Sequence, residues 1–408
     1  MFTLVMVLFL LLPMQPAFAG FSLTLQEAEI LFLSNNIGVK ARKADLKKSE
    51  AEVIDARLLP NPDLRYYSEA ITPRASGADQ LFSVSQPLDI AGKRVKRIEV
   101  AQKRKDAQSL AVDYDVGVLL LQMKQSYYRI LLLKEQAKVL ENMVEMSKQV
   151  EDKIAERVAA GDAAEVERMK LAAEKSKFLR ALEGLRAESK VEKKRLALML
   201  VLEEADFDTE GTIEYKELPA IAAVSAEVAV DWRPDVRAQT TLVEAASALV
   251  ALSRREAFPQ ASVEGGYKWW AEGLGGPVFG VSVSLPLFSR NQGKIAAARA
   301  ETERQRFNYE LTRKNAVKEI EIQKGRISFL QGRIADITQQ LEATREITNI
   351  ARIAYEEGEA GLIEMLDAVR AERELAMERN NTSYEYWAAV FELERATNTR
   401  LSGDGGAR

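Results

Sequence analysis

The sequence predicts a mainly α-helical chain that carries a small β component and is built as two tandem halves. Three observations lead to this prediction. A six-residue motif recurs 199 residues later, two proline-free segments of about 65 residues show a seven-residue apolar spacing, and period-two segments precede each of them.

The composition excludes several classes of function. The 408 residues include no Cys and no His, and the net charge is −4. Without Cys there is no disulfide, thiolate nucleophile or iron–sulfur cluster, and without His there is no imidazole base and no ordinary zinc or copper site. We therefore expect no enzyme, no cofactor and no bound metal, and the acidic balance argues against nucleic-acid binding.

An export signal is predicted at residues 1–19. An apolar run from Leu4 to Leu12 precedes Ala17-Phe18-Ala19, which has the small-x-small pattern of a cleavage site. No Lys or Arg precedes the run, so an N-terminal anchor or a misassigned start are the alternatives. No later stretch holds about 18 uncharged apolar residues, so the exported chain is predicted to be periplasmic, secreted or an outer-membrane barrel.

The chain contains an internal duplication. The segment Ser83–Leu88 recurs as Ser282–Leu287 with five of six residues identical. Shorter matches flank these segments in the same order with offsets of 197 to 201 residues: Val39 with Val236, Pro60 with Pro259, Gly92 with Gly293, and Ala160 with Glu357. We predict a first repeat at 20–215, a second repeat at 216–402 and a disordered tail at 403–408.

Each half is predicted to contain a helix followed by two strands. The helices are expected at Gln26–Arg57 and Asp235–Ala257, and prolines end the first of them. In the second half, alternating apolar residues over Val263–Trp269 and Phe279–Leu285 flank a turn at Gly273–Gly276. In the first half Phe82 and Val84 alternate with serines in the same way, and the strands end near Pro87 and Pro286.

This alternation has two interpretations. Apolar residues on one face and small polar residues on the other, over about ten residues, are typical of transmembrane β-barrel strands. A half-buried sheet of a soluble protein shows the same pattern. In the barrel interpretation, four aromatic residues lie at the membrane–water boundary: Tyr66, Tyr67, Tyr267 and Trp269.

A long helix is predicted to leave each strand pair. From Gln292 to Glu357 the apolar spacing is seven residues, which is typical of coiled coils, and such a helix is a rod of roughly 100 Å. Gly161 and Gly358 interrupt the two long helices at matched positions, and helical patterns resume at Glu165–Leu202 and Leu362–Leu401. Each half therefore forms a helical hairpin with its tip at the glycine.

Four strands cannot close a barrel, and open strand edges inside a membrane leave backbone groups unpaired. The chain is therefore predicted to associate with copies of itself. Two copies would supply eight strands and three copies twelve, and this arithmetic alone does not choose between them.

These features together resemble the TolC-like outer-membrane efflux family. Three segments resemble its heavy-metal branch of CzcC-like and CusC-like channels: Leu58–Pro62, Gln86–Arg94 and Pro286–Gly293. The resemblance implies a homotrimer in the outer membrane, with a twelve-stranded barrel in the lipid and a helical tunnel across the periplasm. It also implies a periplasmic adaptor and an inner-membrane pump of the resistance-nodulation (RND) type as partners, with heavy-metal cations as cargo.

The resemblance also implies candidate sites at the hairpin tips. Tyr355, Gly358 and the acids Glu364 and Asp367 match the family's tip and constriction segment, in which acids one turn apart form a ring. Arg157, Gly161 and Asp162 stand at the other tip. The candidates for adaptor docking are these three residues together with Tyr355 and Gly358. The alternative for both acids is an ordinary solvated position among 61 acidic residues.

Other interpretations stay open at this point. The segment Gly92–Lys105 holds seven basic residues and one acidic residue. This composition indicates either a basic surface that binds nucleic acid or the solvent-exposed start of a helix. A multidrug or type I protein-secretion duct would share the same fold. A periplasmic coiled-coil scaffold without a pore is the alternative from another functional class.

Overall fold

A computed structural model of the chain describes residues 21–69 and 77–402. The predicted signal peptide and the predicted tail at 403–408 lie outside these described residues. The elements in chain order are β1 (Phe21–Leu23), α1 (Leu25–Asn35), α2 (Ile37–Arg57), β2 (Asp63–Glu69), β3 (Asp79–Leu88), α3 (Lys93–Ala160), α4 (Glu165–Leu200), β4 (Phe207–Thr209), α5 (Ala220–Ala223), α6 (Ala226–Ala229), the 3₁₀ turn η1 (Val230–Trp232), α7 (Pro234–Glu256), β5 (Ala261–Trp269), β6 (Gly275–Val283), α8 (Gln292–Glu357) and α9 (Leu362–Thr397).

The chain forms two compact units, and the helices α3, α8 and α9 contribute to both. The hairpin unit comprises Met1–Asn36, Leu120–Glu217 and Arg326–Phe391. The sheet unit comprises Ile37–Leu119, Leu218–Gly325 and Glu392–Arg408. The element order α2-β2-β3-α3-α4 recurs as α7-β5-β6-α8-α9, while the repeat boundary at 215/216 stays a prediction.

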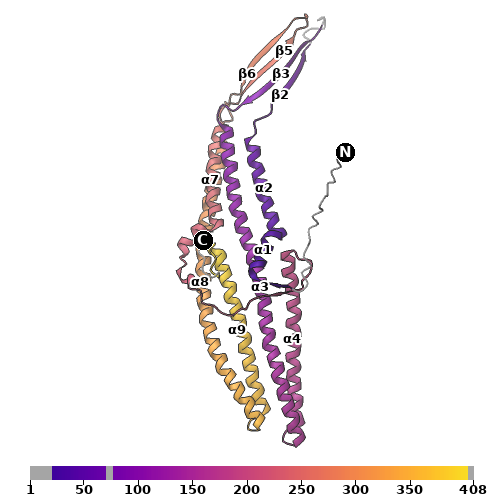
Figure 1. Ribbon diagram of the computed structural model, residues 1–408. Coiled ribbons are helices and arrows are strands. Elements are labelled where there is room, and N and C mark those ends of the chain that lie inside the picture. Colours follow the sequence, from indigo (N-terminus) through magenta and orange to yellow (C-terminus); the bar gives the residue numbers. More distant parts are fainter. Residues whose placement is uncertain (1–20, 70–76, 403–408) are drawn as a thin grey trace, which may run out of the picture. The chain divides into compact units, whose positions relative to one another are not determined.

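The sheet unit contains one four-stranded antiparallel sheet in the order β2-β3-β5-β6 (Figure 1). The central pairing of β3 with β5 joins the two halves of the chain, with Val84 opposite Gly265. In this register one face is apolar and its large side chains are all exposed: Leu64, Tyr66, Phe82, Val84, Val263, Tyr267, Trp269, Phe279, Val281 and Val283.

The opposite face of the sheet is polar. Ser83 and Ser85 are buried there, and the Ser83 hydroxyl donates a hydrogen bond to Glu264. The turn between β5 and β6 differs from the prediction, because Gly275 and Gly276 pair with Trp269 and Lys268 inside the sheet. A Cβ at Gly275 would lie 2.7 Å from Tyr267 Cε1, so only glycine fits under this ring.

The first predicted helix, Gln26–Arg57, is wrong as a single element. It is interrupted at Asn36, whose ψ of 127° is extended, so that α1 and α2 are separate helices. The Asn36 side chain donates to the Met199 carbonyl at 2.7 Å, and this carbonyl lies in the last turn of α4, where it has no partner within the helix.

The long helices agree with the predicted coiled-coil spacing. Helix α8 has the predicted bounds, and four residues at seven-residue intervals are each at most 3% exposed: Ile320, Ile327, Ile334 and Leu341. Burying such a side chain stabilises the fold by about 1.5–3 kcal/mol. Figure 1 shows α3 beside α4 and α8 beside α9 in the hairpin unit. Among the described residues, no helix combines the length and apolar character needed to cross a membrane.

Candidate functional site

The candidate site lies in the hairpin unit, at the two helix tips. Gly161 has φ of +85° and Gly358 has φ of +83°, a left-handed conformation that glycine adopts without steric cost. At the first tip, Asp162 N–H donates to Arg157 O at 2.8 Å and Gly161 N–H to Val158 O at 3.1 Å. The second tip repeats both bonds, so both helices end in the same Schellman motif.

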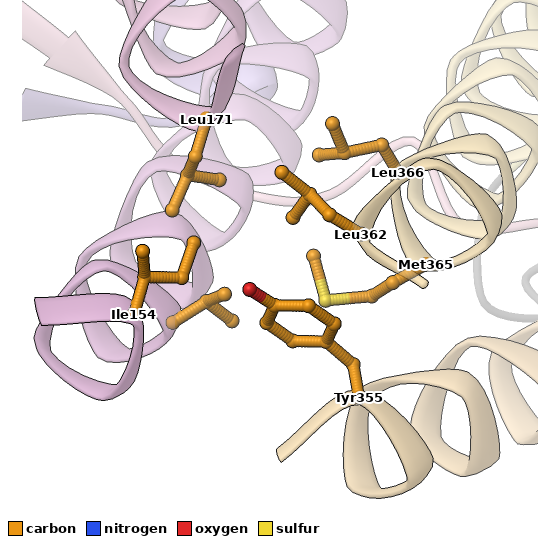
Figure 2. Packing of buried hydrophobic residues seen from close by; sticks show 7 residues of the cluster. Ile154, Leu171, Tyr355, Leu362, Met365 and Leu366 are labelled. Atoms are coloured by element: carbon orange, nitrogen blue, oxygen red, sulfur yellow. The ribbon is translucent and has the colours of Figure 1, made fainter. Parts of the chain in front are cut away.

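An apolar cluster joins the two hairpins at this level. It contains residues from all four helices: Val150, Ile154, Leu171, Tyr355, Leu362, Met365 and Leu366. Figure 2 shows the Tyr355 ring between Ile154 of α3 and Met365 of α9, with Leu171 and Leu362 above it. Tyr355 is only 1% exposed, so its aromatic ring is part of the core that holds the two tips together.

Tyr355 also makes polar contacts with the first hairpin. Its hydroxyl donates to Glu167 Oε2 at 2.8 Å, and its carbonyl accepts from Arg157 Nη1 at 2.7 Å. The Arg157 guanidinium lies 5.1 Å from the centre of the Tyr355 ring, within reach of a cation–π interaction. Burial and the Glu167 carboxylate raise the pKa of Tyr355, which keeps its hydroxyl protonated as a donor.

A second link between the hairpins is a bidentate ion pair. Arg370 of α9 donates from Nε and Nη2 to the two oxygens of Glu174 on α4, at 3.0 and 2.9 Å. The Glu174 side chain is only 5% exposed. Hydrogen bonds from Arg370 and, less strongly, from Lys177 outweigh burial and lower the pKa of Glu174 to about 2.

The two predicted constriction acids lie near this ion pair but differ from each other. Both are exposed on the first turns of α9, three residues apart and therefore on one helical face. Asp367 accepts from Arg370 Nη1 at 2.9 Å, so a cation already offsets its charge. Glu364 makes no hydrogen bond or ion pair within the described residues.

Sequence reasoning did not identify Glu174 and Arg370. A signal was present, because Glu174 falls between Leu171 and Phe178 on the buried stripe of α4. A charged residue at such a position needs a partner. The structure also adds Glu167, which accepts the hydrogen bond of the Tyr355 hydroxyl.

The other predicted site residues lie in the sheet unit. Tyr66, Tyr267 and Trp269 are exposed on the apolar face, and the rings of Tyr267 and Trp269 are 4.6 Å apart. Tyr67 pairs with Leu81 of β3, and Leu81 in turn pairs with Lys268 of β5. Tyr67 therefore lies on the polar face.

The two prolines also lie in the sheet unit. Pro87 is the penultimate residue of β3, beyond the last residue that pairs with β2, and Pro286 lies three residues after β6. Within residues 21–69 and 77–402, no group of three acidic side chains could hold a metal ion.

Comparisons with known proteins agree with this architecture. The family model described as "Outer membrane efflux protein" matches residues 227–399. The cobalt-zinc-cadmium resistance protein CzcC of Cupriavidus metallidurans is 25% identical over 366 residues, which cover 88% of this chain and 86% of that protein.

Two solved structures show the same fold. The chain matches CusC with a TM-score of 0.77 and 16% identity, over 93% of this chain and 94% of that chain. It matches the outer membrane protein VceC of Vibrio cholerae with a TM-score of 0.78 and 17% identity, over 93% of this chain and 97% of that chain.

Proposed function

We propose that the chain belongs to the outer membrane efflux protein family, whose model matches residues 227–399, and that it is the exit duct of a tripartite system that expels heavy-metal cations. Members of this family are channels of the outer membrane with a long periplasmic helical part, and they are not enzymes. The observation that carries the proposal is the sheet, whose large apolar side chains are exposed on a single face.

The sheet supports a trimeric barrel. Its outer strands are β2 and β6, and among the described residues their outer edges pair with no strand. Unpaired edges cannot be left in lipid. Three copies joined from β2 to β6 close twelve strands, with the apolar face toward lipid and the polar face toward a lumen.

The hairpin tips are the gate of this duct. The Tyr355 contacts and the Glu174–Arg370 pair hold the two hairpins of one chain together. A periplasmic adaptor docks around Arg157, Gly161, Asp162, Tyr355 and Gly358, and separation of the hairpins widens the opening. Large apolar side chains exposed near the tips suit such a partner: Val166, Met169, Ile353 and Ile363.

The constriction consists of three copies of Glu364 and three of Asp367. A ring of carboxylates attracts cations and repels anions. Because Arg370 offsets the charge of Asp367 and no described residue offsets that of Glu364, Glu364 supplies most of the cation preference.

The cargo is assigned from the relatives. The similar protein of Cupriavidus metallidurans is named for resistance to cobalt, zinc and cadmium, so we assign divalent metal cations to this duct and their selection to an inner-membrane pump of the RND type. A multidrug or protein-secretion duct would differ only in its pump partner.

Conductance in planar lipid bilayers tests the channel directly. The purified protein should form pores that select cations in a potassium chloride gradient. A non-pore scaffold would give no conductance and would be washed from membranes by carbonate without detergent.

A further inference from the structure

Basic residues gather where the helices of the sheet unit meet the sheet. In Figure 1 the four helix ends involved, those of α2, α3, α7 and α8, lie at the same end of the sheet. We define the basic belt as the six residues Arg57, Lys93, Arg94, Arg97, Arg254 and Arg290. They come from both halves of a chain whose net charge is −4.

Helix dipoles do not account for this belt. Arg57 and Arg254 stand in the last turns of α2 and α7, where cations are favoured. The other four stand at the starts of α3 and α8, where the dipole disfavours cations and favours acids. Neither of these helices has an acid in its first turn, so the helices that these four residues adjoin do not account for their positive charge.

The chain itself supplies few partners for these cations. Lys93 Nζ donates to the Phe258 carbonyl at 2.9 Å, and Arg94 Nε donates to the Arg57 carbonyl at 2.7 Å. The side chains of the remaining four belt residues make no hydrogen bond or ion pair within the described residues: Arg57, Arg97, Arg254 and Arg290.

The acidic residues near the belt neutralise only part of its positive charge. Asp89 accepts the backbone N–H groups of Lys93 and Arg94 at 2.7 and 2.8 Å, so it caps α3. Glu256 faces Lys294 at 3.8 Å, and Asp55 is exposed. An excess of unpaired guanidinium groups therefore remains at the surface.

Apolar surface adjoins these guanidinium groups. A groove of about 600 Å³ includes Leu58, Leu59, Leu88, Arg94 and Arg97 in its lining. Leu88 belongs to β3 on the apolar side of the sheet, and Leu58 and Leu59 are 58% and 63% exposed. The belt thus borders the surface that the proposed function places in lipid.

We propose that the basic belt binds the phosphates of anionic phospholipid headgroups in the leaflet on the helical side of the membrane. This inference rests on the proposed function for the position of the sheet. Charge complementarity favours a phosphate partner, and the adjoining leucines favour one that carries acyl chains, which distinguishes a lipid from free phosphate.

Lipid binding to the full-length protein in detergent tests the proposal, with native mass spectrometry as the readout and phosphatidylglycerol and phosphatidylcholine as probes. The test variant combines Arg57→Gln, Arg97→Gln and Arg290→Gln, whose side chains have no described partner. The matched control combines Arg237→Gln, Arg306→Gln and Arg326→Gln, which are exposed arginines without described partners outside the belt.

The wild type and the control should prefer phosphatidylglycerol. The belt variant should bind this lipid at least about tenfold more weakly than they do. Glycerol phosphate should not displace the lipid. Equal binding by all three proteins, or no preference in the wild type, overturns the inference. A changed cation/anion permeability ratio with unchanged lipid binding would place the arginines in the lumen and also overturn it. Absence of conductance, by contrast, counts against the proposed channel itself.

Discussion

The hydroxyl of Tyr355 donates a hydrogen bond to Oε2 of Glu167 at 2.8 Å, although 188 residues separate the two in the chain. Tyr355 lies in the last turn of the long helix of the second half, and Glu167 lies in the first turn of the return helix of the first half. One buried side chain therefore joins both halves of the duplicated chain at the tips, which the proposed function makes the gate of the duct.

Removing this hydroxyl should favour the open tips. Tyr355→Phe keeps the ring in the apolar cluster but loses a hydrogen bond, which costs about 1 kcal/mol of stability. We expect a larger single-channel conductance in planar bilayers. Tyr66→Phe is the control, because Tyr66 is exposed and its hydroxyl has no described partner. Equal conductance in both variants would contradict the gating role.

The Glu174–Arg370 pair predicts a dependence on acid. The folded-state pKa of Glu174 is lowered to about 2 from its ordinary value of 4.5, so its stabilisation is complete above about pH 4.5 and is lost as the pH falls toward about 2. The thermal midpoint of the wild type should fall across this window. The thermal midpoint of Glu174→Gln should be lower than that of the wild type at neutral pH, and it should change less as the pH falls.

An exposed acid provides the control for this titration. Glu183→Gln removes a carboxylate of the same helix that has no described partner, and its pH profile should match that of the wild type. If the Glu174 variant also shows the wild-type profile, the ion pair does not stabilise the folded chain.

The constriction acids should contribute unequally to ion selectivity. Two unit charges at 4 Å interact by about 1 kcal/mol in water, a factor of about five in local concentration. Glu364→Gln should therefore lower the cation/anion permeability ratio several-fold, and Asp367→Asn should lower it less because Arg370 already offsets that charge. Glu52→Gln, an exposed acid of α2, should leave the ratio unchanged. The reverse order for the two tip variants would refute the assignment.

Adjacent residues of β6 test which face of the sheet meets lipid. Val281 is 75% exposed on the apolar face, and Ser282 lies on the polar face. Val281→Arg should cost about 2–4 kcal/mol in the membrane and reduce the amount of trimer recovered from outer-membrane fractions. Ser282→Arg should assemble normally, and equal recovery of the two variants would rule out lipid contact on this face.

The tip glycines should resist substitution. Gly161→Ala and Gly358→Ala place a Cβ on a left-handed backbone, which costs about 1–2 kcal/mol each. Gly184→Ala in the interior of α4, where a Cβ would meet nothing within 4 Å, should stabilise the chain by up to about 1 kcal/mol. Thermal unfolding of the three variants measures whether each substitution lowers or raises the stability of the chain. Stabilisation by a tip substitution would contradict the turn geometry.

The features of the fold that depend on local sequence were predictable. Helix α8 has the predicted bounds, and both hairpin turns occur at the predicted glycines, because heptad spacing and helix-ending glycines are local signals. The interruption at Asn36 was not predictable in this way, since its side chain bonds to Met199, 163 residues away.

The candidate site was predictable only in part. The tip residues came from the resemblance to a family, whereas Glu174 and Arg370 lie 196 residues apart and meet only in the folded hairpin unit. Tyr67 was grouped with Tyr66, although consecutive strand residues point to opposite faces, and the register places Tyr67 on the same face of the sheet as Lys268.

The most direct test of the central claim is growth of a strain that lacks this chain, with and without its restoration. Growth should be measured across cobalt, zinc, cadmium and nickel, alongside dyes and detergents. The strain should be sensitive to metals alone, and the wild-type chain should restore its growth. Sensitivity to dyes and detergents with metals unaffected would contradict the metal-efflux assignment and favour a multidrug duct of the same fold.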